Sequence, residues 1–323
     1  MPALDPFDRR LLIVSGKGGT GKTTVAAALA VAAARTGRRV LLAEVEGRGG
    51  AFDLLGLPRS GFEERPTPLG FWVLAITGRD ALLEYLWLFF RMGALSRTLS
   101  RAHVLETVTD GVPGFRDLMV AGKLYELTAW RSTSREPEAR RRVAYDLVVI
   151  DAPPSGQVLG MLRAPRTYRG IIRGGRPAQQ LVSIDRLFRE ESRVALVTTP
   201  EDLAVTETLE TSEALRDNGF PSPMVVANRV RPAPFPSGTR AAGKRLTPAA
   251  LAARLREAGG DVDEETAQAV LRAAREEDVR VEAERRQLRR LPVLDVELPM
   301  VASERFGRNE VAGLAELLGG EAG

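Results

Sequence analysis

Residues 11–24 read Leu11-Leu-Ile-Val-Ser-Gly-Lys-Gly-Gly-Thr-Gly-Lys-Thr-Thr24, an apolar run that leads directly into a glycine-rich loop. The loop has Gly16, four further residues, and then Gly21-Lys22-Thr23. Glycines at this spacing let backbone N–H groups close around phosphate oxygens, while the following helix points its positive end at them. The apolar run predicts a buried strand, and Val25 to Arg35 predicts the helix, which Gly37 ends.

This loop predicts that the chain binds a nucleoside triphosphate, with Lys22 at the outer phosphates and Thr23 on Mg²⁺. The chain has 46 lysines and arginines, of which only four are lysines, and two of those four lie in this loop. A compact ammonium fits among glycines better than the wide guanidinium group does. The expected nucleotide contacts in the loop are Gly16, Gly18, Gly19, Thr20, Gly21, Lys22, Thr23 and Thr24.

Further strand-like runs recur along the 323 residues, separated by helical or loop segments. This alternation predicts an α/β fold of the P-loop NTPase type, with a mostly parallel sheet flanked by helices. The predicted strands are Leu11–Ser15, Arg39–Val45, Phe71–Ile76, Asp146–Asp151, Arg193–Thr198, Pro223–Asn228 and Pro292–Leu298.

We expect a single domain over residues 1–323, with a helical insertion at about 77–145 and a charged helical segment at about 247–290. In the charged segment, Pro248 suits a first helical turn and Gly259-Gly260 suits a break. The apolar stretch Ala81–Phe90 is too short to span a bilayer, so it is a core or lid helix or a surface for an apolar client. Predicted loops are Arg131–Arg142, Arg163–Pro177 and Arg231–Thr239.

Composition excludes several classes of function. The chain has no cysteine, which excludes disulfides and thiolate metal sites, and its one histidine, His103, has no second zinc ligand nearby. The net charge is only +4, and acidic residues interleave the arginine clusters, so we expect no nucleic-acid partner. No segment is long enough to span a membrane and the first residues lack a signal peptide pattern, which indicates a cytoplasmic protein.

Polar residues follow three of the predicted strands, at the edge of a parallel sheet where phosphate chemistry is expected. Glu46 follows Val40–Val45 and is placed to orient or activate water. Asp151 closes a buried strand, where it can either hold Mg²⁺ opposite the phosphate loop or cap a turn. Asn228 ends a strand, where its amide can either pair with the edge of adenine or form a turn.

Taken together, these residues resemble the family of arsenical pump-driving ATPases and of ATPases that guide tail-anchored membrane proteins, within the deviant Walker A class. The resemblance covers nearly the whole chain. The loop from Gly16 to Thr24 matches the class signature, and Asp151-Ala-Pro-Pro-Ser-Gly156 resembles the second switch of the family. Residues 199–208 and Val225–Val230 are similar to the segments that precede and supply the base-binding asparagine.

This resemblance implies a switch that binds and hydrolyses ATP with Mg²⁺ as a dimer, in which Lys17 reaches the nucleotide of the partner. It also implies that Asn228 binds the base, and that Glu46 and Asp151 stand at the first and second switches. Pro113–Met119 resembles the helical insertion where targeting members hold apolar clients.

The sequence also departs from this family. Its first switch normally reads Asp-Pro-Ala-His, whereas Glu46-Gly-Arg-Gly49 stands here, and Gln157 replaces the usual histidine. A carboxylate displaced by about 1 Å can lower a rate about a hundredfold. The absence of cysteine removes the arsenite-binding thiols and the shared zinc site of known members, so the chain most resembles the cysteine-free single-domain bacterial type.

Three interpretations follow. The first is a self-sufficient dimeric ATPase that couples ATP to a client or membrane-protein partner through the helical insertion. The second is a nucleotide-binding regulatory subunit with weak hydrolysis, active in a heterodimer with a paralogue. The third is a positioning ATPase, which the acidic, glycine-broken ending Val311–Gly323 disfavours, because membrane-bound positioning ATPases usually end in a basic amphipathic helix.

Overall fold

The structure is a computed structural model that describes residues 6–47, 49–90, 112–129, 145–235 and 238–319. At its centre is an eight-stranded sheet in the order β3-β4-β2-β5-β1-β6-β7-β8, parallel throughout except between β3 and β4. This confirms the predicted α/β P-loop NTPase fold. The strands are β1 (Leu11–Gly16), β2 (Val40–Val45), β3 (Arg65–Pro66), β4 (Trp72–Ile76), β5 (Leu147–Asp151), β6 (Ser192–Thr198), β7 (Met224–Val230) and β8 (Val296–Pro299).

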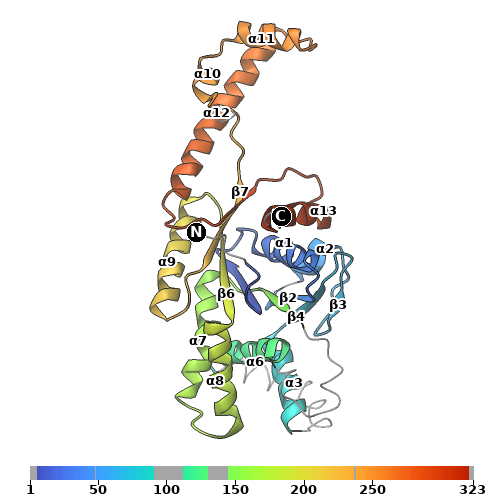
Figure 1. The fold of residues 1–323 in the computed structure, drawn as a ribbon, viewed down its shortest axis with the longest axis vertical. Helices are drawn as coiled ribbons and strands as arrows, with labels where there is room; N and C mark the ends of the chain where they lie inside the picture. Colours follow the sequence, from blue (N-terminus) through green and yellow to red (C-terminus); the bar gives the residue numbers. More distant parts are fainter. Residues whose placement is uncertain (1–5, 48, 91–111, 130–144, 236–237, 320–323) are drawn as a thin grey trace.

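Helices cover both faces of this sheet (Figure 1). One face carries α1 (Lys22–Arg35), α2 (Gly50–Leu55) and α13 (Arg308–Leu318). The other carries α6 (Phe115–Ala129), α7 (Ser155–Arg169), α8 (Gly175–Glu190) and α9 (Asp202–Asp217). The remaining described helices are α3 (Gly78–Phe90), α10 (Arg240–Arg245), α11 (Pro248–Glu257) and α12 (Glu264–Leu288).

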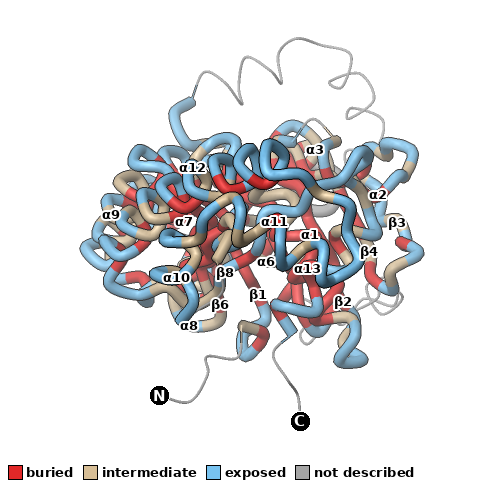
Figure 2. Tube along the Cα trace, turned by 90° about the horizontal axis from the view of Figure 1, so that it is seen from above, coloured by how far each residue is buried: buried red, intermediate tan, exposed pale blue. Residues whose placement is uncertain are grey.

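Alternating side chains of the central strands divide the core into two layers, because successive residues of a strand point to opposite faces. Leu12 and Val14 pack with α1 and α13, whereas Leu11 and Ile13 pack with α6, α7 and α8. All residues of β1, β2 and β5 are buried. In Figure 2 the buried residues follow the strands and the inward sides of the helices, with exposed residues around them.

The structure corrects two details of the predicted sheet. The two-residue strand β3 was not predicted, since so short a segment ending in a proline carries no alternating pattern. The last strand begins at Val296, four residues later than expected. The other six predicted strands are present within one or two residues of their expected bounds.

The loop predicted for Arg163–Pro177 was wrong at both ends. Helix α7 continues to Arg169 with Pro165 inside it, and only residues 170–174 separate it from α8. Leu162, Ala164 and Tyr168 are buried here. Packing of this apolar face therefore maintains the helix through a proline that lacks one backbone hydrogen bond.

Helices α3 and α6 lie in the part of the sequence predicted as an insertion, and they pack against each other below the sheet in the view of Figure 1. His103 and the predicted loop Arg131–Arg142 lie outside the described residues. Within the described ranges, every helix is too short or too polar to cross a bilayer.

Helices α10, α11 and α12 form an arm, residues 240–290, that projects from the body on the side opposite α3 (Figure 1). Thr247 caps α11 with Pro248 in its first turn, and residues 258–263 separate α11 from α12, where the glycine break was expected. The charged segment predicted at 247–290 therefore corresponds to α11 and α12 with their connection.

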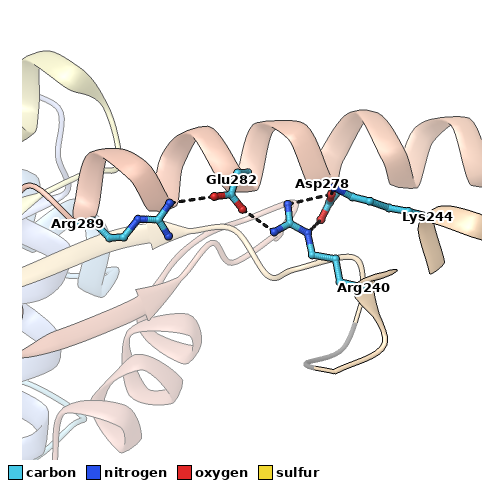
Figure 3. Close-up of polar contacts among 5 residues, drawn as sticks. All are labelled: Arg240, Lys244, Asp278, Glu282 and Arg289. Atoms are coloured by element: carbon cyan, nitrogen blue, oxygen red, sulfur yellow. Dashed lines mark hydrogen bonds and ion pairs between the residues drawn. The ribbon is translucent and has the colours of Figure 1, made fainter. Parts of the chain in front are cut away.

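Ion pairs fasten α10 to α12 (Figure 3). Arg240 donates two hydrogen bonds to Asp278, at 2.7 and 3.0 Å, and a further one to Glu282. Lys244 lies 2.9 Å from Asp278, and Arg289 lies 2.9 Å from Glu282. Hydrogen bonds from Arg240 and then from Lys244 lower the pKa of Asp278, whose side chain is only 3% exposed. Asp278 is thus a buried anion held by two cations of α10.

We expect Arg240→Ala to loosen α10 from α12, because the buried Asp278 carboxylate then keeps, among the described residues, only Lys244 as its partner. Backbone amides of residues 240–245 should exchange with deuterium faster than in the wild type. Arg254→Ala, which removes an exposed arginine of α11, serves as the control. Unchanged exchange in the Arg240 variant would show that apolar packing alone holds α10.

Candidate functional site

The glycine-rich loop joins the carboxyl end of β1 to the amino end of α1, at one edge of the sheet. Because β2, β5, β6 and β7 run parallel to β1, their carboxyl ends meet at the same edge. The predicted site residues Glu46, Asp151 and Asn228 therefore lie at the same edge of the sheet as the loop, although they are far apart in the sequence.

Gly16 lies where β1 passes closest to β6. Its φ angle is +147°, and a Cβ atom there would lie 2.1 Å from the carbonyl oxygen of Val197. No other residue type fits this position without separating the two strands. The first glycine of the motif is thus required by sheet packing.

Gly21 and Asn228 make the second close approach at the loop. A Cβ atom on Gly21 would lie 2.3 Å from the Asn228 side-chain nitrogen, which donates a 2.9 Å hydrogen bond to the carbonyl of Thr20. The neighbouring Arg229 has a φ of +59° and donates to the carbonyl of Gly19 at 3.2 Å. In this structure the Asn228 amide therefore braces the loop backbone, and its predicted contact with a nucleotide base stays a prediction.

Thr23 and Asp151 meet beside the loop, where the Thr23 hydroxyl donates a 2.7 Å hydrogen bond to the carboxylate. Burial raises the pKa of Asp151 to about 6, against the opposing effect of the Thr23 hydrogen bond. Burial also lowers the pKa of Lys22, although Asp151 and Glu207 attract its charge. A hydroxyl and a poorly solvated carboxylate side by side are hard oxygen donors, so these residues fit Mg²⁺.

Lys17 follows Gly16 in the loop and is half-buried. Its carbonyl accepts hydrogen bonds from the Thr20 hydroxyl at 2.9 Å and the Lys22 ammonium at 3.3 Å. Within the described part of the chain, no acceptor bonds to the Lys17 ammonium itself. Gly18 and Gly19 are exposed beside it, and Thr24 lies half-buried at the start of α1.

The carboxylate of Glu46 contacts α3 and α6. It has a φ of +52°, uncommon for a residue with a side chain, and its carboxylate accepts a 2.7 Å hydrogen bond from the backbone N–H of Gly78. Arg116 lies 3.8 Å from the same carboxylate. Glu46 thus connects the end of β2 to α3 and α6, and its predicted role in positioning water stays a prediction.

Glu44 belongs to this edge and was missed in the sequence analysis. Its side chain is 3% exposed, and its carboxylate accepts hydrogen bonds from the N–H groups of Gly49, Gly50 and Ala51 at 3.0, 2.9 and 3.3 Å. It is the cross-strand neighbour of Asp151 and raises the pKa of that residue. A glutamate within an otherwise apolar strand was the signal that could have identified it.

A cavity of about 280 Å³ lies between α3, α6 and α8, away from the glycine-rich loop. Its lining is largely apolar and includes Leu82, Tyr85, Phe115, Met119 and Leu181. Lys123 borders it and lies 2.6 Å from Glu84 and 3.1 Å from Glu126. The stretch Ala81–Phe90 was predicted as a core or lid helix or a surface for an apolar client. Its first residues line this cavity.

Comparison with known proteins supports a nucleotide-binding site in this chain. Residues 11–257 match the model of the CobQ/CobB/MinD/ParA nucleotide-binding domain. The chain therefore belongs to this family of nucleotide-binding proteins, which includes ATPases of the ParA and MinD type.

Individual relatives carry ATPase names. The chain is similar to the ATPase BagA of Mycobacterium tuberculosis, with 37% identity over 230 residues. The match covers 69% of this chain and 66% of that relative, slightly less than two thirds of its length. The chromosome-partitioning ATPase Soj of Thermus thermophilus is 33% identical over 46% of this chain and 47% of its own. A protein of Aquifex aeolicus named after the arsenical pump-driving ATPases is 23% identical over 69% of this chain and 81% of its own.

Proposed function

We propose that this protein is an Mg²⁺-dependent ATPase that acts as a dimeric switch in the cytoplasm. The observation that carries the proposal is the meeting of Thr23 and Asp151 at 2.7 Å beside a loop that also presents Lys22. Thr23 and Asp151 would hold Mg²⁺, which supplies charge neutralisation at the phosphates. Lys22 and the backbone N–H groups of the loop would bind the phosphates.

The dimer is proposed from Lys17. Lys17 is half-buried in the loop, and we propose that its ammonium reaches the nucleotide of a second subunit, a homologous copy or a paralogue. In that assembly Glu46 positions the attacking water, which requires its carboxylate to leave Gly78 and Arg116. Asn228 is proposed to contact the base through the part of its amide that does not bond to Thr20.

The output of the switch is proposed to be the helical region formed by α3, α6 and α8. Two observations support this: the apolar cavity lies there, and Glu46 links the end of β2 to the first turn of α3. A change at Glu46 would therefore reach the surface proposed to hold an apolar client or a membrane-protein partner. A role like that of the arsenical pump-driving or tail-anchored-protein-targeting ATPases, within one domain that carries a helical insertion, is the more specific form of this proposal.

The second candidate is a regulatory subunit with weak hydrolysis that acts with a paralogue. The contacts of Glu46 favour it, since its carboxylate is bonded to the N–H of Gly78 and lies 3.8 Å from Arg116, and must leave both before it could position water. In that case the paralogue supplies the groups that complete hydrolysis.

Phosphate release from ATP and Mg²⁺, measured over a range of protein concentrations, tests the proposal. Activity per molecule should rise with concentration, and should fall at least a hundredfold in Lys17→Ala and Glu46→Ala. Arg254→Ala, which lies on the exposed face of α11, should keep wild-type activity.

The outcomes separate the two candidates. Constant activity per molecule across concentrations would argue against a dimer. Tight ATP binding without turnover would exclude the self-sufficient ATPase and favour the regulatory subunit, and absence of ATP binding would exclude both.

A further inference from the structure

Glu207 is an acidic residue at the proposed nucleotide site to which no role has yet been assigned. It lies in the second turn of α9, which follows the carboxyl end of β6 and packs against α7 and β1. Its side chain is half-buried, and the hydroxyl of Ser155 donates a hydrogen bond to its carboxylate. Ser155 is the first residue of α7 and lies within the predicted second switch, residues 151–156.

The charge of Glu207 also acts on the glycine-rich loop. Helix α9 contacts β1, which leads into this loop, and Glu207 lies close enough to Lys22 for their charges to attract. No ion pair joins Glu207 to any cation in the described ranges. Glu207 is therefore a half-buried acidic residue, without an ion pair in the described ranges, that contacts the second switch and lies near the loop built for phosphate.

An anion at this place opposes the binding of a triphosphate, because like charges repel strongly where solvent is partly excluded. The repulsion is greatest for the outermost phosphate, which carries the most charge and is expected closest to Lys22. Taken alone, this repulsion would only lower the affinity for ATP. The contact of Glu207 with Ser155 connects the repulsion to the second switch.

We propose that Glu207 is a positioning residue that holds the second switch through Ser155 in the resting state and is displaced specifically by the γ-phosphate of ATP. The inference rests on the proposed ATP-binding function. The γ-phosphate repels the Glu207 carboxylate and takes over the attraction of Lys22, which frees Ser155 and with it the start of α7. ADP lacks this phosphate and leaves the contact in place, so the switch distinguishes the two nucleotides.

The anchoring of the switch loop at its other end supports this assignment. The hydroxyl of Ser15, at the end of β1, donates a 2.7 Å hydrogen bond to the carbonyl of Pro153. Asp151 is held by Thr23. A backbone bond from Ala152 to the carbonyl of Val14 joins the loop to β1 as well. These contacts thus tie the loop to β1 and α1, whereas the Ser155–Glu207 contact joins it to a different element, α9.

The test is the affinity of the full chain for a fluorescent, non-hydrolysable ATP analogue and for the matching ADP analogue, both with Mg²⁺. Glu207→Gln removes the charge and keeps the size of the side chain, and Ser155→Ala removes the hydroxyl. Each variant should bind the ATP analogue about tenfold more tightly than the wild type, while ADP affinity changes less than about threefold. The double variant should gain less than the product of the two single gains, because both changes act on one contact.

Glu210→Gln, on the exposed face of the same helix, is the matched control and should bind both nucleotides like the wild type. Equal gains for ATP and ADP, or weaker ATP binding in Glu207→Gln, would overturn the assignment. Thermal unfolding of each variant shows whether it is folded. A wild-type chain that binds neither nucleotide would instead refute the proposed function itself.

Discussion

Gly16→Ala is expected to destabilise the protein by roughly 3 kcal/mol or more, and to abolish nucleotide binding. The new methyl group would lie 2.1 Å from the carbonyl oxygen of Val197, and a side chain at a φ of +147° is strained in any case. Both partners belong to buried strands at the centre of the sheet, so neither can move away without disturbing the core. Urea unfolding gives the stability change, and titration with a fluorescent nucleotide gives the loss of binding.

Gly18→Ala in the same loop is the matched control. Gly18 is exposed, has no positive φ, and a Cβ atom there would have no neighbour within 4 Å. Its stability should stay within about 1 kcal/mol of the wild type. Equal destabilisation of the two variants would mean that general loop rigidity, and not the approach of β6, requires glycine at position 16.

Asp151→Asn is expected to have opposite effects on stability and activity. Burial raises the pKa of Asp151 from 3.8 to about 6, so in the metal-free protein the folded state disfavours the charged carboxylate. The protonated carboxyl stabilises the folded state fully below pH 3.8, and this stabilisation is lost as the pH rises through about 6. At pH 8 the ionised group destabilises the fold by an amount on the order of 3 kcal/mol.

Asparagine cannot ionise, so the variant should be more stable than the wild type at pH 8 in the presence of a chelator. The gain should shrink to about half at pH 5, because the folded wild type is then mostly protonated. Mg²⁺-dependent ATP turnover should fall at least a hundredfold, since the proposed metal ligand is lost. Asp261→Asn, exposed in the connection between α11 and α12, controls for a general change in charge. A gain that does not depend on pH would show that Asp151 is not the titrating group.

Local patterns were enough to predict the part of the fold that carries the loop. The apolar run of β1, the glycine-rich loop and the alanine-rich α1 follow one another in the sequence. Each can be recognised from a few neighbouring residues. The parallel sheet followed from the recurrence of such runs. Strand β3 and the helical path through Pro165 did not, because they depend on contacts with β4 and with the buried side of α7.

The candidate site shows the same division. Glycines, Lys22, Thr23 and Asp151 were predicted because a motif or a strand end marks them. Glu207 was missed because nothing in α9 distinguishes it from the exposed acidic residues of the same helix, and its partner Ser155 is 52 positions away in the sequence. The bond between Asn228 and Thr20 spans 208 positions and follows only from the order of strands in the sheet.

Helix α1 limits which parts of this molecule can respond to a nucleotide. Its residues from Val25 to Ala33 are all buried, mostly alanines, and they fill the space between the sheet, α2 and α13. A helix packed on all sides cannot shift without displacing the core, so the loop at its amino end acts as a fixed frame of reference. The motion that we propose ATP to drive would then fall on the segments after β2 and β5, which side-chain contacts such as Glu46 with Gly78 and Ser155 with Glu207 hold in place. In mechanical terms, the phosphate loop would be the stator of the proposed switch, and the two neighbouring loops its moving parts.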